Sequence, residues 1–109
     1  MADEIALNLL IDDKFIELNN LIDSRGGEVD LSNANIRARD LRGCHFKKAN
    51  LRNTYLRLSD LRGLDLSQAD LEGASMRDAK VSGVYFPKNI DPQEIYLSLR
   101  FGTRMRIRA

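Results

Sequence analysis

Every fifth residue from position 31 to position 86 is large and apolar, and the phase does not break. A period of five fits neither an α-helix, which repeats every ~3.6 residues, nor a β-strand, which repeats every ~2. The residue two positions before each of these is mostly small, and the one between them is often Asp or Asn. The pattern predicts a coil in which each five-residue unit forms one side and points its small and large apolar residues inward. The predicted core ladder is Leu31, Ile36, Leu41, Phe46, Leu51, Leu56, Leu61, Leu66, Leu71, Met76, Val81 and Phe86.

This unit resembles the A(D/N)LXX motif of the pentapeptide-repeat family. Residues 49–53 (Ala-Asn-Leu-Arg-Asn) and 69–73 (Ala-Asp-Leu-Glu-Gly) match the motif in full, and the resemblance covers 60 of 109 residues in twelve uninterrupted repeats. It implies a mainly β fold, a right-handed quadrilateral β-helix with four pentapeptides per coil and therefore three coils. Such a solenoid needs a cap at each end, because open ends expose unpaired backbone groups and the apolar ladder.

Both flanks have the sequence signals of helical caps. Residues 3–24 mix apolar residues with acids and asparagines, which indicates helix, and Asp12-Asp13 could divide it in two before Gly26-Gly27 ends it. A second helix is expected to begin at Asp91-Pro92 and to end at Gly102. We therefore expect one structural domain with an N-terminal helical cap (1–28), a pentapeptide-repeat β-helix (29–88), and a C-terminal capping helix with a basic tail (89–109). These flanks are also similar to caps of cyanobacterial pentapeptide-repeat proteins.

The composition says little about function and more about the cellular compartment. The chain has 17 basic and 16 acidic residues, although residues 1–28 carry a net charge of −5 and residues 29–88 a net charge of +4. A single cysteine, the absence of a basic leader with a cleavage site, and the shortness of the apolar run at residues 9–11 favour a cytoplasmic protein without membrane insertion.

Catalytic chemistry has few candidate residues. The only cysteine and the only histidine are neighbours, Cys44 and His45, a pair that could support thiolate chemistry. The repeat instead places Cys44 in an inward slot and His45 in an outward slot, so we expect a packed thiol and a solvated imidazole. Glycines at positions 43, 63, 73 and 83 fall in the last slot of their repeats, where they serve corner turns. The sequence predicts no enzyme, no cofactor and no metal site.

Seven of the twelve residues that directly follow a large apolar residue of the repeat are basic. Residues twenty apart should stack on one face, so Arg37, Arg57 and Arg77 form one predicted column, and Arg42 and Arg62 form the next. Like charges at this spacing repel unless acids balance them, and Asp40 and Asp60 could partly balance the first column. Two interpretations remain open: a solvated, laterally paired basic face, or a docking surface for an anionic partner.

Several residues depart from the motif. Arg39 occupies an inward slot, and we expect it to lean outward and pair with an acid of the N-terminal cap. Tyr55 and Tyr85 replace the usual Asp or Asn, and Leu58 stands at an outward corner. Tyrosine beside arginine is typical of interfaces, so Tyr55 and Leu58 could form one patch with the Arg37 column.

The C-terminal residues 103–108 alternate basic and apolar side chains, with Arg104, Arg106 and Arg108 in the basic positions. This segment could add as a strand to an edge, either its own or a partner's, or it could be a frayed tail.

Mimicry of duplex DNA, the best-known activity in the family, requires a long acidic rod, whereas this chain is short and its repeats are basic. We therefore expect a non-catalytic protein–protein interaction module: an adaptor, a regulator or a small subunit of a larger assembly, which binds an acidic protein surface. The alternative is a nucleic-acid-binding protein that uses the arginine columns, although the few aromatic residues and the acidic N-terminal cap disfavour it. A cap edge could also form a homodimer.

Overall fold

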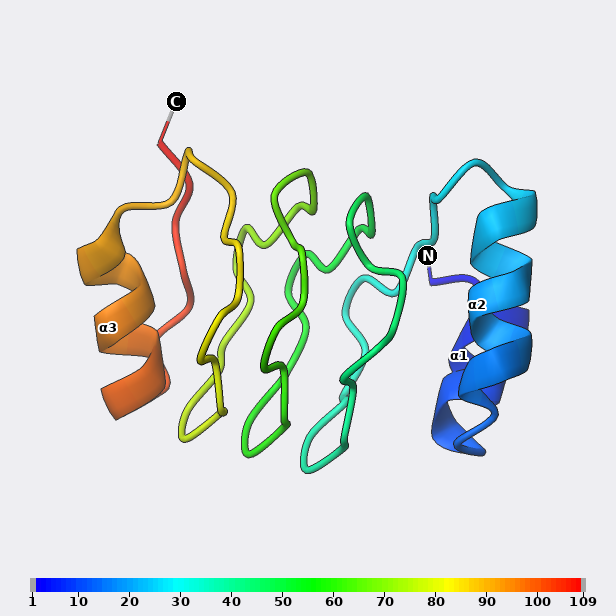
Figure 1. Ribbon diagram of the computed structural model, residues 1–109. Helices are drawn as coiled ribbons and strands as arrows, with labels where there is room; N and C mark the ends of the chain where they lie inside the picture. The colour runs from blue at the N-terminus through cyan, green and yellow to red at the C-terminus, as the bar shows by residue number, and fades with distance from the viewer. Residues whose placement is uncertain (1, 109) are drawn as a thin grey trace.

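The computed structural model describes residues 2–108. Its helices are α1 (Glu4–Ile11), α2 (Phe15–Ser24) and α3 (Pro92–Phe101). Figure 1 shows a stack of coils with α1 and α2 at one end, α3 at the other, and the C-terminal segment running back beside the last coil. None of the helices in this described part of the chain has the length and apolar content needed to cross a bilayer.

Parallel β-bridges join residues that are twenty positions apart. Leu31 N donates to Asn50 O at 2.9 Å, and Leu51 N donates to Asp70 O at 2.8 Å, so the same register continues from coil to coil. Twenty residues are four repeats, and the chain therefore forms a β-helix-like solenoid. The bridges are isolated, and residues 2–108 contain no continuous strand. The structure therefore shows a β-helix-like solenoid rather than the expected mainly β fold with regular strands. The bridges are Asp30↔Asn50, Asn35↔Tyr55, Asp40↔Asp60, Asn50↔Asp70, Tyr55↔Ser75, Asp60↔Lys80 and Asp65↔Tyr85.

Most corners of the coils use a left-handed residue. Four glycines there have φ between 72° and 84°: Gly43, Gly63, Gly73 and Gly83. These values confirm the prediction that the glycines serve corner turns. Larger residues take the same conformation at other corners, including Ala38 at φ 58° and Leu58 at φ 62°. A β-carbon makes this conformation cost about 1–2 kcal/mol, so the corners at Ala38 and Leu58 store strain.

The apolar ladder fills the interior of the coils. Ten of its twelve residues are at most 2% exposed, whereas Val81 and Phe86, in the last coil, are only partly buried because no further coil covers them. The small inward slots also admit hydroxyl groups when these are bonded to backbone. Thr54 Oγ1 donates to Leu51 O at 2.8 Å, and Ser59 Oγ donates to Ile36 O at 2.6 Å.

Helices α1 and α2 cover the first coil. The carboxylate of Asp3 accepts from Ile5 N at 3.0 Å and caps α1. Asp13, at φ 57°, separates the two helices, which confirms the predicted break at Asp12-Asp13. Ile5 and Ile16 are mostly exposed, and the residues that face the core are Ala6, Leu10, Leu18 and Ile22.

Arg39 connects these helices to the first coil. Its guanidinium lies 3.1 Å from an Asp13 carboxylate oxygen and donates to Ile11 O at 3.1 Å. A cation is favourable at the C-terminal end of a helix, where the last carbonyl groups lack helical partners. The prediction that Arg39 pairs with an acid of the N-terminal cap is confirmed.

Helix α3 begins with Pro92 in its first turn and ends before Gly102, at φ 74°, as the sequence predicts. Its side chains and carbonyl groups reach the last coil: Ser98 Oγ accepts from Met76 N at 3.0 Å.

The segment after α3 is ordered against the last coil. Met105 is fully buried, accepts from Gly73 N at 2.7 Å and donates to Ala74 O at 2.9 Å. Of the predicted alternatives for this segment, the structure therefore shows addition to the chain's own edge.

Candidate functional site

Arg37, Arg57 and Arg77 lie at successive levels of one side of the solenoid, where two β-bridges fix their spacing. All three are exposed. Among residues 2–108, Arg37 and Arg57 form no ion pair, and Arg77 approaches only Asp78, at 3.8 Å. We call these three residues the free column, because they present positive charge to solvent and acidic side chains of the chain balance almost none of it.

Arg42 and Arg62 form a second column, which we call the paired column. Arg62 donates to both carboxylate oxygens of Asp60, at 2.9 and 2.7 Å, and Arg42 donates in the same way to Asp40, at 2.9 Å for each bond. Arg42 Nε also lies 3.3 Å from Asp60. The prediction that Asp40 and Asp60 balance the free column is therefore wrong, because both carboxylates are bonded to the paired column.

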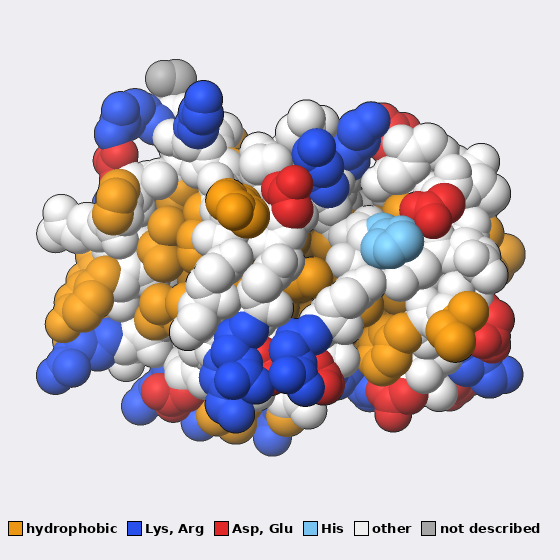
Figure 2. Space-filling model, in the orientation of Figure 1, with side chains coloured by type: hydrophobic (Ala, Val, Ile, Leu, Met, Phe, Trp, Pro, Cys, Tyr) orange, Lys and Arg blue, Asp and Glu red, His pale blue; other side chains and the backbone are white. Residues whose placement is uncertain are grey.

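The electrostatics of the paired column follow from these contacts. The hydrogen bond from the Arg62 side chain lowers the pKa of Asp60 to about 2, and the Arg42 side chain lowers the pKa of Asp40. Figure 2 shows basic and acidic side chains in direct contact over the coils. The paired column thus presents ion pairs rather than net positive charge.

A groove runs along the free column. Its volume is about 340 Å³, and its lining joins three coils to the end of α3. Phe101, at the end of α3, is 59% exposed and closes the groove at the level of Arg77. The groove is lined by Asn35, Arg37, Tyr55, Arg57, Ser75, Arg77, Phe101 and Gly102.

Tyr55 lies at the middle level of this groove and is 43% exposed. Arg104 donates to the Tyr55 hydroxyl at 2.9 Å, and its guanidinium lies 5.7 Å from the centre of the Tyr55 ring. The C-terminal segment therefore adds a fourth arginine to this face, in contact with Tyr55. The patch that the sequence predicts joins Tyr55 and Leu58 to the Arg37 column and does not include Arg104.

Two other predicted residues lie outside the groove lining. Leu58 is 49% exposed at the corner after Arg57, next to the free column in sequence. Tyr85 is more exposed still, but its backbone bridges Asp65 on a different side of the solenoid. The structure therefore separates Tyr85 from Tyr55.

Arg106 and Arg108 have internal partners in α3 and at its start. Arg106 donates to both carboxylate oxygens of Glu94, at 3.3 and 3.0 Å, and Arg108 forms an ion pair with Asp91. These contacts hold the C-terminal segment against α3. We therefore leave Arg106 and Arg108 out of the candidate surface.

Cys44 and His45 point in different directions, as the repeat predicts. Cys44 is buried, and burial raises the pKa of its thiol to about 12, which disfavours the reactive thiolate. His45 is exposed, and its Nδ1 lies 2.9 Å from an Asp23 carboxylate oxygen of α2. Within residues 2–108, no three His, Cys, Asp or Glu side chains lie close enough together to hold a metal ion.

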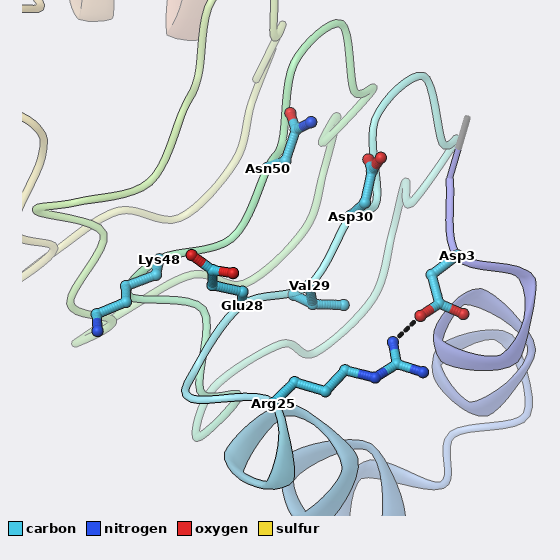
Figure 3. A pocket seen from close by; sticks show the side chains of 7 residues that line it. All are labelled: Asp3, Arg25, Glu28, Val29, Asp30, Lys48 and Asn50. Carbon is cyan, nitrogen blue, oxygen red and sulfur yellow. Dashed lines mark hydrogen bonds and ion pairs between the residues drawn. The ribbon is translucent and has the colours of Figure 1, made fainter.

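A second hollow, of about 400 Å³, lies between the N-terminal helices and the first two coils. Figure 3 shows Arg25 reaching toward Asp3, with which it forms an ion pair, while Glu28 and Lys48 point elsewhere. Asp30 and Asn50 stand on successive coils above this pair. Charges of both signs line this hollow, so it offers no single-sign surface, and we leave it out of the candidate site.

Sequence reasoning missed Phe101 as part of the groove. The sequence indicates a helix that ends at Gly102, but it does not show on which side of the solenoid the helix ends. The positive φ of Gly102 turns the chain close to the Arg77 side chain, where an added β-carbon would lie 3.3 Å from Arg77 Cβ. Only this tertiary contact identifies Phe101 as a neighbour of the free column.

Comparison with known proteins gives one match. A family model described as pentapeptide repeats matches eight copies over residues 30–63, 40–78 and 49–86. No curated protein and no solved structure matches the chain.

Proposed function

The chain belongs to the pentapeptide-repeat family, and from this premise we propose that it is a non-catalytic protein–protein interaction module: an adaptor, a regulator or a small subunit of a larger assembly. The observation that carries the proposal is the free column beside the Tyr55 groove. Arg37 and Arg57 have no acidic partner among residues 2–108, whereas the arginines of the paired column do.

The chemistry of the groove selects the class of partner. Three exposed guanidinium groups favour carboxylates, because an arginine can bind a carboxylate through two parallel hydrogen bonds. Tyr55 and Phe101 offer aromatic surface within the same groove. We therefore propose that the partner is an acidic protein surface with at least one apolar side chain that packs against these rings.

The finer features of the fold belong to the same proposal. We take the solenoid to be the right-handed quadrilateral β-helix of the family, with three coils of four pentapeptides, in a cytoplasmic protein. Bridges between residues twenty positions apart support four repeats per coil. A rigid solenoid is suited to binding, because its outward side chains are held at fixed spacing by the backbone ladder.

The proposal is tested by affinity capture from the native host after nuclease treatment. The wild-type chain is compared with Arg37→Glu/Arg57→Glu/Arg77→Glu and with the charge-matched control Lys14→Glu/Lys47→Glu/Lys48→Glu, whose exposed lysines lie outside the groove. We expect one protein to be retained by the wild type and the control and lost with the free-column variant.

Two outcomes would contradict the proposal. Equal retention by all three chains would show that the free column is not the docking face. Binding only before nuclease treatment, with a steep loss as salt increases, would instead assign the arginine columns to nucleic acid.

A further inference from the structure

The last coil has backbone N–H and C=O groups that point along the solenoid axis, away from the coil before it. Some sides of this coil have hydrogen-bond partners for these groups and others do not. On the sides that α3 and the C-terminal segment cover, these groups have partners. Gly73 N and Ala74 O bond Met105, Met76 N bonds Ser98 Oγ, and Asp78 N donates to Leu99 O at 2.9 Å. The chain thus completes the edge of its last coil over residues 73–78.

The remaining sides are not completed in this way. One coil below, Leu61 N, Gly63 N and Leu66 N donate upward to the last coil at 2.8–2.9 Å, and Ser59 O and Leu64 O accept from it. The equivalent groups of the last coil, twenty residues on, have no hydrogen-bond partner among residues 2–108. They are Ala79 O, Val81 N, Gly83 N, Val84 O and Phe86 N. We call residues 79–86 the open edge.

The open edge lies beside apolar side chains. Val81, Val84 and Phe86 are only partly buried, and Tyr85 is 69% exposed. Figure 2 shows hydrophobic side chains at the surface toward the end of the molecule where Figure 1 places α3. A strand added here would therefore gain backbone hydrogen bonds and would also cover apolar surface.

Two lysines beside the open edge determine which charge an added strand should carry. Lys80 lies near the start of the open edge, and Lys88 lies two residues beyond its end. Both lysines are exposed, and neither forms an ion pair among residues 2–108. The corner at Gly83 separates the side that carries Lys80 from the side that leads to Lys88. A second copy of this edge would bring its own lysines to the same two sides, and like charges across a pair of strands destabilise the pairing. An acidic segment would be attracted to both lysines.

We propose that the open edge binds, by strand addition, a segment of another protein that bends at the level of the Gly83 corner and in which small apolar residues alternate with acidic residues. The apolar residues cover Val81, Val84 and Phe86, and the acidic residues approach Lys80 and Lys88. This site does not share a residue with the groove of the free column, so it stands independently of the function proposed above.

The test uses the full chain, labelled with ¹⁵N, and a synthetic peptide that alternates valine with glutamate. Two matched peptides serve as controls: one with lysine in place of glutamate, and one N-methylated at the valines so that those backbone N–H groups are removed. Amide shifts are followed during titration, and amide exchange is measured in the free and bound states.

We expect the glutamate peptide to saturate with a Kd at or below about 1 mM, with shifts centred on residues 79–86 and slower exchange at Val81, Gly83 and Phe86. The lysine peptide should bind on the order of tenfold more weakly, and the N-methylated peptide should not saturate at about 1 mM. Lys80→Glu/Lys88→Glu should reverse the preference between the two charged peptides without a risk to folding, because both lysines are exposed.

Other results would overturn the proposal. These are no saturation at about 1 mM, equal binding of the N-methylated peptide, or shifts centred on the free column. Protection of the three amides by self-association, without peptide, would assign the edge to a second copy of the chain. Arg37→Glu/Arg57→Glu/Arg77→Glu should leave peptide binding unchanged, so failure of this proposal and failure of the free-column proposal are distinguishable.

Discussion

In one repeat Arg62 follows Asp60 by two positions, and in the preceding repeat Arg57 follows Tyr55 by two positions. The two arginines occupy the same slot, yet only Arg62 is neutralised. The Asp60 carboxylate accepts from both Arg62 N, at 3.1 Å, and Arg62 Nε, at 2.9 Å, which a tyrosine in that slot cannot do. The residue two positions before thus accounts for the difference between Arg57 and Arg62. Arg52, which follows Asn50, is instead paired with Asp70 of the next coil, at 3.0 Å.

The corners that follow the two columns differ as well. After the paired column the corner residues are glycines, which take a positive φ without strain. After the free column they are Ala38, Leu58 and Asp78, all at φ 58° to 62°. The free column therefore combines unbalanced charge with backbone strain, and strained backbone clusters at functional sites.

The largest effect is expected from truncating a buried leucine beside each column, which compares the contribution of the core at the two columns. Leu56 and Leu61, beneath Arg57 and Arg62, are each 1% exposed. Leu56→Ala and Leu61→Ala should each lower the free energy of unfolding by about 2–5 kcal/mol, measured by urea denaturation. If the two losses in free energy of unfolding differed by more than the experimental error, the packing beneath the two columns would differ as well as their surface charge.

A change at Tyr55 should convert the free column toward the paired one. In Tyr55→Asp the new carboxylate would accept from Arg57, as Asp60 accepts from Arg62, and the aromatic surface would be lost. We expect partner affinity, measured by titration calorimetry with the captured partner, to fall by about 2 kcal/mol, or about thirtyfold. Tyr55→Phe keeps the ring and should lose much less; an equal loss would place the binding energy in the hydroxyl contact with Arg104.

The repeat made the interior predictable. Each five-residue repeat has one small and one large apolar residue that point inward, and this pattern identifies the buried ladder. The corner glycines and the break at Asp12-Asp13 follow from local conformational preferences. The ion pairs of the paired column could also have been predicted, because Asp40 precedes Arg42 and Asp60 precedes Arg62 at a fixed spacing. Local spacing determines both kinds of feature.

The rest depends on how separate segments pack. The position of Phe101 in the groove requires knowledge of where α3 ends over the last coil. The contact between Arg104 and Tyr55 joins residues 49 positions apart, and no periodicity encodes it. The exposure of Ile5 and Ile16 likewise depends on which face of each short helix meets the first coil.

A smaller effect is expected from relieving the strain at the free column. Leu58→Gly should raise the free energy of unfolding by about 0.5–1 kcal/mol, because the cost of a β-carbon at positive φ exceeds the entropy that glycine adds to the unfolded chain. The same variant should weaken partner binding if Leu58 contributes to the patch. Gly63→Ala is the matched control: its β-carbon would meet no atom within 4 Å, so a loss of about 1 kcal/mol would report the backbone strain alone. No gain in Leu58→Gly would show that the corner is not strained.

The smallest effect concerns the paired column and depends on pH. The pKa of Asp60 is lowered to about 2 in the folded chain by Arg62, whereas the unfolded carboxyl has its ordinary, higher pKa. A lowered pKa contributes stability that is present above the unfolded pKa, and this contribution is lost as the pH falls through the folded pKa. Asp60→Asn should therefore be less stable than the wild type at pH 7, and the difference should shrink between about pH 4 and about pH 2. Urea denaturation across this range measures the difference, with the exposed Asp12→Asn as the control. A difference that stays constant with pH would mean that Asp60 acts through packing, and the two columns would then not be distinguished by charge.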